Sequence, residues 1–131
     1  MKILFMAATV FIKSLHLEYR LWIAELNFDI NLIRIFNDRL IEMTEENKSA
    51  GAKPTLADFG KKFNSTRETI DELRHRMHIE KMNLAATARE HPAPDYKITI
   101  PANYETIRED FFRFRVSFNE LKSGFLRFED K

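Results

Sequence analysis

The sequence predicts an all-α protein: an antiparallel three-helix bundle of the long coiled-coil type with an overlong first helix. Three segments repeat apolar residues in alternating steps of three and four, and two stretches rich in helix breakers separate them. Alternation with a period of two is absent. Only three glycines and four prolines occur in 131 residues, so turns are few. One domain, 1–131, with helices at about 3–48, 55–90 and 103–129 is therefore expected.

The first segment carries two sets of apolar residues. The main seam, the row of residues that follows the repeat of three and four, consists of Leu15, Tyr19, Trp22, Leu26, Ile33, Phe36, Leu40 and Met43. Asp29 takes one position of the same repeat. The second set consists of Leu17, Leu21, Ile23, Phe28, Ile30, Leu32 and Ile35. A helix that is apolar on two sides is either central in a bundle or shared with another subunit. Homodimerisation through the first helix is therefore the expected partner interaction.

The second segment follows a break at Gly51 and Pro54, which end one helix and start the next. Thr55 is expected to cap its N-terminus through its hydroxyl group. The seam of this segment consists of Phe59, Phe63, Ile70, Leu73, Met77 and Leu84, and Thr66 and Glu80 take two further positions of the same repeat. It is expected to pack at a shallow angle against the first helix.

The third segment begins after 90–103, where three prolines exclude a continuous helix. Within that stretch, 97–100 is β-prone but too short and isolated for a sheet, so an extended segment over the bundle end is expected. Asn103 is the expected cap of the third helix. The seam is a column of rings: Tyr104, Ile107, Phe111, Phe114, Phe118, Leu121, Phe125 and Phe128. This spacing indicates a packed core rather than a cofactor site or a base-stacking surface.

The apolar run 3–12 would overhang the paired part of the bundle. It is too short for a transmembrane helix, which needs roughly 20 residues, and no cleavage site for a signal peptide follows it. A bare apolar end usually marks a contact surface. Three coverings are open: a second subunit, the loop 91–102 folded back, or a membrane that the protein binds peripherally.

Composition excludes several functional classes. The net charge of +1 and the pI near 8.0 do not indicate nucleic-acid binding. Membrane association is not the expected partner interaction either. The absence of cysteine excludes disulfides and thiolate metal sites and fits a cytoplasmic location. No Gly-rich phosphate loop and no nucleophile elbow occur. An enzyme is therefore not expected, and no cofactor is indicated.

Two stretches, "LHLEYRLWIAELNFDINLIRIFNDRL" at 15–40 and "EHP" at 90–92, resemble a group of small bacterial helical proteins of uncharacterised function. The shared features are His16, Glu18 and Trp22, followed by a Glu-Leu pair and a closing Glu-His-Pro. The resemblance implies a helical bundle and implies no activity.

The strongest polar pattern joins the first two helices. Glu25 and Asp29 lie one turn apart, and Glu72 and His75 form a Glu-x-x-His step of the kind found in dimetal bundles. These four residues are the candidate metal ligands. Because Leu73 marks the core side, Glu72 and His75 are expected off the core. Alternatively, Asp29 is a buried polar residue that fixes register or oligomeric state.

A second candidate is a surface zinc site formed by His16 and His91, with Glu18 and Glu90 nearby, at one end of the bundle. The preferred interpretation of the whole chain remains a non-enzymatic interaction or scaffold protein that self-associates through its first helix. A metal-binding or ligand-binding bundle is the alternative, and peripheral membrane association through 3–12 is a further one.

Overall fold

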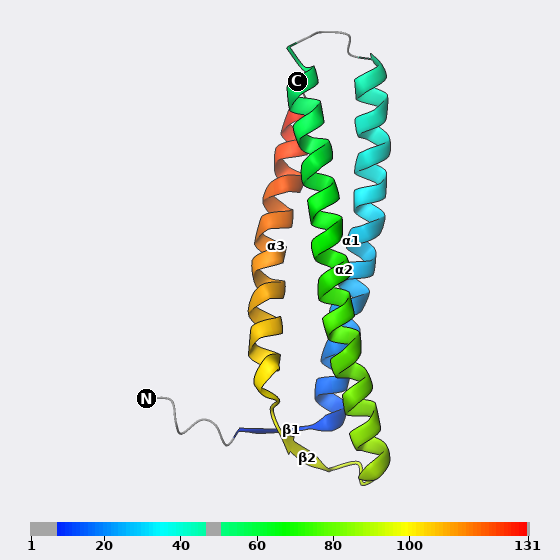
Figure 1. The fold of residues 1–131 in the computed structure, drawn as a ribbon, viewed down its shortest axis with the longest axis vertical. Coiled ribbons are helices and arrows are strands. Elements are labelled where there is room, and N and C mark those ends of the chain that lie inside the picture. The colour runs from blue at the N-terminus through cyan, green and yellow to red at the C-terminus, as the bar shows by residue number, and fades with distance from the viewer. Residues whose placement is uncertain (1–7, 47–50, 131) are drawn as a thin grey trace, which may run out of the picture.

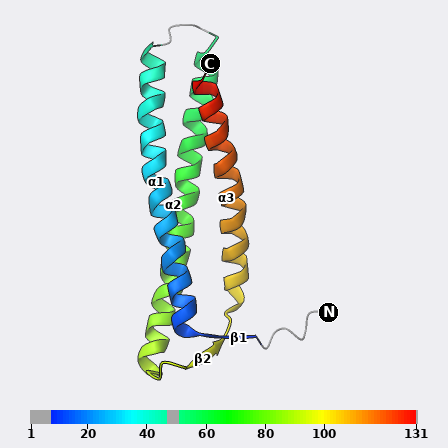
Figure 2. The ribbon, with the colours of Figure 1, turned by 180° about the vertical axis from the view of Figure 1, so that it is seen from behind.

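A computed structural model describes residues 8–46 and 51–130 of the chain. Three long helices lie side by side in antiparallel order: α1 (Ile12–Glu46), α2 (Lys53–Glu90) and α3 (Ala102–Glu129) (Figures 1 and 2). The predicted all-α, three-helix architecture is confirmed. The described helices contain 35, 38 and 28 residues, so α1 is not longer than α2.

Two short strands close the end of the bundle at which α1 begins (Figure 1). β1 (Thr9–Phe11) pairs antiparallel with β2 (Lys97–Thr99), and Val10 lies opposite Ile98. This ribbon corrects two expectations, since the first helix begins at Ile12 rather than near residue 3, and the β-prone stretch does form a small sheet. Sequence inspection missed the pairing because each strand finds its partner far away in the chain.

The connection between α2 and α3 therefore covers the start of α1. The backbone N–H of Ile12 donates to the carbonyl of Tyr96 at 3.4 Å, and the N–H of Ile100 donates to the carbonyl of Ala8 at 3.3 Å. Of the three coverings considered for the apolar N-terminal run, the loop 91–102 folds back against its described part, while Phe11 stays 40% exposed. The remaining positions, 3–7, lie outside the described residues.

Both predicted side-chain caps are wrong. Helix α2 starts two residues before Thr55, and its capping position is Ala52, with Pro54 in the first turn. Proline suits that turn because its missing N–H would have no helical acceptor there. Helix α3 is preceded by Pro101 at φ −59° and ψ 145°, so Asn103 lies inside the helix. Neither capping residue makes a side-chain hydrogen bond to its helix.

The three seams meet in one continuous core, as their spacing predicts. At the end near the α1–α2 connection, the rings of Phe36, Phe59, Phe63 and Phe125 contact one another at centroid distances of 5.2–6.2 Å. At the ribbon end, Trp22 stacks on Tyr104 at 5.8 Å and contacts Tyr19 and Phe111. The ring column of α3 is thus buried against α1 and α2.

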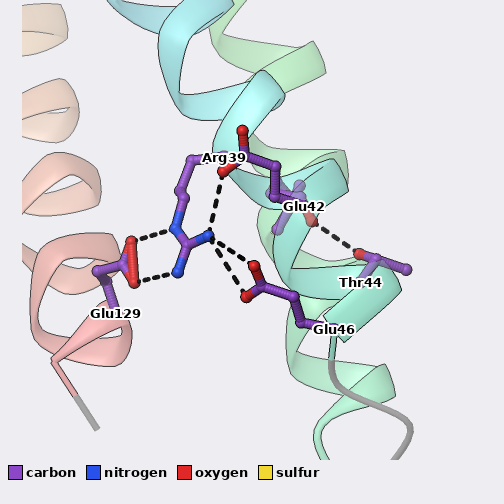
Figure 3. Close-up of polar contacts among 6 residues, drawn as sticks. Arg39, Glu42, Thr44, Glu46 and Glu129 are labelled. Carbon is purple, nitrogen blue, oxygen red and sulfur yellow. Dashed lines mark hydrogen bonds and ion pairs between the residues drawn. The ribbon is translucent and has the colours of Figure 1, made fainter.

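An ion-pair group holds the last turn of α3 against α1 (Figure 3). The guanidinium of Arg39 donates to both carboxylate oxygens of Glu129, with 2.9 Å from Nη2 to Oε2. It also contacts Glu42 and Glu46 in its own helix. These hydrogen bonds raise the pKa of Arg39 and lower that of Glu129. The contact fixes the alignment of the two helix ends.

Candidate functional site

Glu25, one of the four candidate metal ligands, is paired across the bundle. Arg115 of α3 donates to both of its carboxylate oxygens, from Nε and Nη2, at 2.7 Å each. The Arg115 guanidinium also lies over the ring of Phe111, 4.4 Å from its centroid. Glu25 therefore faces α3, whereas the sequence placed it at the interface of the first two helices.

Asp29, the second candidate, is the polar member of the α1 seam and is only 6% exposed. Within the described residues it makes no hydrogen bond and no ion pair. Burial, followed by the neighbouring Glu25 charge, raises the pKa of Asp29 to about 6, while Lys122 and Arg115 act in the opposite direction. This environment matches a buried polar residue in the α1–α3 contact.

Glu72 and His75, the other two candidates, are exposed on α2, as their positions beside Leu73 predict. Glu72 approaches Arg76 at 3.9 Å, and both border a shallow hollow of about 330 Å³ between α2 and α3. Asp110 of α3 binds Arg76 there at 2.9 Å. The four candidates are therefore divided between two faces of the bundle.

The two histidines proposed for zinc lie near the same end of the bundle but in different surroundings. The ring of His91 stacks flat on Tyr96, with centroids 4.1 Å apart. Burial lowers the pKa of His16, and the charges of Lys81 and Arg20 lower it further. Those charges would also oppose a bound cation. Among residues 8–46 and 51–130, no group of three or more histidine or carboxylate side chains is arranged to hold a metal ion.

The outer face of α1 exposes several large apolar side chains. Of the second apolar set, Ile23 is buried, and Ile30 and Leu32 are half-buried against the core. The exposed positions follow steps of four, three, four, three and four along the helix. We call them the outer seam: Leu17, Leu21, Ala24, Phe28, Asn31 and Ile35.

Besides the Arg39–Glu129 pair, two further polar contacts of the α1–α3 interface were not found by sequence reasoning. Arg115 follows the seam residue Phe114, and Glu25 precedes the seam residue Leu26. Such flanking positions are where interhelical ion pairs form, so the signal was present. The second contact is the hydroxyl of Tyr104, which donates to Glu18 at 2.6 Å. Tyr104 was assigned only an apolar role.

No family model, curated protein sequence or solved structure matches this chain. The resemblance to small bacterial helical proteins therefore stays a prediction. In the part of the chain that the structure describes, none of the helices combines the length and apolar character needed to cross a membrane.

Proposed function

We propose that the protein is a non-enzymatic interaction protein that self-associates through the outer seam of α1. The observation that carries this proposal is the exposure of all six outer-seam positions on the described structure. Leu21 and Phe28 are each 60% exposed, and so is Ile35. Large apolar side chains rarely line up in this way on a surface that meets only water.

The spacing of the outer seam suits another helix. Leu21, Phe28 and Ile35 are each seven residues apart, which keeps them on one line along a slightly underwound helix. From Leu17 to Ile35 the seam runs ~27 Å at ~1.5 Å per residue. A partner helix with the same repeat would bury this whole length. The outer seam of a second copy provides that repeat.

Side-chain sizes favour an antiparallel pair of α1 helices. In that orientation, Ala24 of each copy meets Phe28 of the other, so a small residue accommodates a ring. Leu17 then meets Ile35, and Leu21 meets Asn31. A parallel pair would instead place Phe28 against Phe28 and Ala24 against Ala24, which alternates crowding with voids.

The charges beside the outer seam give this arrangement a salt dependence. Arg20 and Arg34 flank the seam on the side toward α2, and an antiparallel pair brings Arg20 of one copy near Arg34 of the other. Salt screens this repulsion, so the association should strengthen as the ionic strength rises. Association driven by opposite charges would instead weaken as the ionic strength rises.

Light scattering during size-exclusion chromatography tests the proposal. The wild-type protein should show twice the monomer mass, and Phe28→Glu should show the monomer mass with unchanged circular dichroism. Val116→Glu is the matched control, because Val116 of α3 is also 60% exposed. A monomer mass for the wild-type protein at high concentration would contradict the proposal. The same loss of dimer in both variants would also contradict it.

The absence of native cysteine allows a direct test of orientation. In the antiparallel pair, Leu17→Cys alone should give no covalent dimer, because the two copies of residue 17 lie ~27 Å apart. A mixture of Leu17→Cys and Ile35→Cys chains should form a mixed disulfide. Efficient cross-linking of Leu17→Cys alone would instead indicate a parallel pair.

A further inference from the structure

A groove of about 660 Å³ runs between the first turns of α1 and the last turns of α2. Its floor is apolar and is formed by Ile12, Leu17, Leu84, Ala85 and Ala88. The volume lies in the range of sites that take small molecules. None of the site residues predicted from the sequence lies there except His16.

The polar residues that line the rim of this groove are basic, apart from Ser14. Lys13, His16, Arg20 and Arg89 line it, and no acidic side chain does. Lys13, Arg20 and Arg89 make no ion pair within the described residues. By contrast, several arginines elsewhere in the bundle are held by carboxylates, as Arg115 is by Glu25 and Arg76 is by Asp110. Among the described residues, these three cations of the rim therefore lack a directly bonded carboxylate.

The surroundings of the groove add positive potential. The first turn of α1 contains no acidic residue, so the positive end of its dipole is not offset by a neighbouring carboxylate in that turn. Lys81 lies close enough to His16 to lower its pKa. Glu18 is in the same part of α1 but bonds to Tyr104 of α3, away from the groove. Asp95 borders an adjoining hollow that it shares with Lys13.

We propose that this groove binds a small amphipathic anion, namely an aliphatic chain that ends in a carboxylate. The chain would lie on the apolar floor, and the carboxylate would lie between Lys13 and Arg89 at the start of α1. From Lys13 to Arg20 the groove runs ~10 Å along α1, at ~1.5 Å per residue. This length suits a ligand whose aliphatic chain is of medium length.

Other occupants fit the groove less well. A second copy of the chain would bring the same uncompensated cations to the rim, and like charges at an interface oppose association. A flat bilayer surface would meet the rim but would not reach Ala85 and Ala88 on the floor. The groove shares Leu17 with the outer seam, but the proposal does not rest on self-association, because Lys13, Ala88 and Arg89 lie outside that seam.

Methyl NMR of the full chain, with decanoate as the probe, tests this site. Decanoate should shift the Ala85 and Ala88 methyl signals in a saturable manner. Acetate, which has the charge without the chain, should not do so at the same concentration. Decyltrimethylammonium, which has the chain with the opposite charge, should also leave them unchanged.

Charge reversal provides the second part of the test. Lys13→Glu combined with Arg89→Glu should weaken decanoate binding by about tenfold or more, as expected for lost charge-assisted contacts. Arg67→Glu is the matched control, since Arg67 is an exposed α2 arginine without an ion pair in the described residues. It should leave binding unchanged, and none of the three substitutions should alter the solution mass.

Four results would overturn the proposal. Equal methyl shifts with the cationic amphiphile would show that the floor alone binds, and equal weakening by Arg67→Glu would show a general charge effect. Shifts at Val116 and Leu126 without shifts at Ala85 and Ala88 would place binding on other exposed apolar residues. Binding to anionic phospholipid vesicles without any decanoate shift would assign the basic rim to a lipid surface.

Discussion

Glu25 and Arg115 meet across the α1–α3 interface through two hydrogen bonds of 2.7 Å each. The same guanidinium lies 4.4 Å from the centroid of Phe111 and 5.0 Å from that of Phe112. Arg115 therefore joins a carboxylate of one helix to the aromatic face of another. Both oxygens of the Glu25 carboxylate are therefore engaged by Arg115.

The Glu25–Arg115 pair is expected to contribute modestly to stability because both side chains are partly exposed. A double-mutant cycle with Glu25→Ala and Arg115→Ala should give a coupling energy of ~0.5–1 kcal/mol in urea unfolding. Arg115→Ala alone should cost more than Glu25→Ala, because it also uncovers the rings of Phe111 and Phe112. A coupling energy of zero would show that the pair adds nothing to stability.

Asp29→Asn should stabilise the protein at neutral pH. The pKa of Asp29 is raised from 3.8 to about 6 on folding, so the folded state binds more protons than the unfolded state between these values. Stability from this group is therefore present below about pH 4 and is lost as the pH rises through 6. At pH 7, the substitution should raise the free energy of unfolding by ~1–3 kcal/mol.

The pH dependence is the specific signature of Asp29. Urea unfolding at several pH values should show that Asp29→Asn removes a decline in stability between pH 4 and 6. Asp38→Asn, at an exposed position of the same helix, is the control and should leave the decline in place. If the wild-type and Asp29→Asn curves run parallel, the carboxylate of Asp29 is not destabilised by burial.

Tyr19→Phe should leave stability unchanged or raise it by up to ~1 kcal/mol. Tyr19 is 1% exposed, and its hydroxyl has no hydrogen-bond partner among the described residues. Removing an unsatisfied buried hydroxyl relieves its desolvation cost. Tyr104→Phe is the informative contrast: it should cost ~0.5–1.5 kcal/mol because it deletes the hydrogen bond to Glu18. Thermal unfolding of both variants distinguishes the two hydroxyls.

Phe125→Ala should be strongly destabilising. The Phe125 ring is buried and contacts the rings of Phe36, Phe59 and Phe63. Its removal should cost ~3–5 kcal/mol in chemical unfolding. The adjacent Leu126 is exposed, and its replacement by Ala should change stability by less than ~0.5 kcal/mol. Similar losses at the two positions would contradict the assignment of the α3 seam.

Local sequence patterns identified the core but not the partners of its flanking residues. The steps of three and four placed residues such as Leu26, Phe63 and Phe118 correctly in the interior. Glu25 was expected to meet partners on α2, yet it binds Arg115 of α3. Likewise, a run of three strand residues in isolation gives no indication of a partner 88 positions away, as between Val10 and Ile98.

The sequence alone determined that three helices bury three apolar seams, because helical periodicity is a property of each segment by itself. Only the tertiary structure decided which helix lies on which side of α1. Three antiparallel helices can be arranged with either hand, and both arrangements bury the same seams. The hand that forms brings Arg115 rather than Glu72 to Glu25.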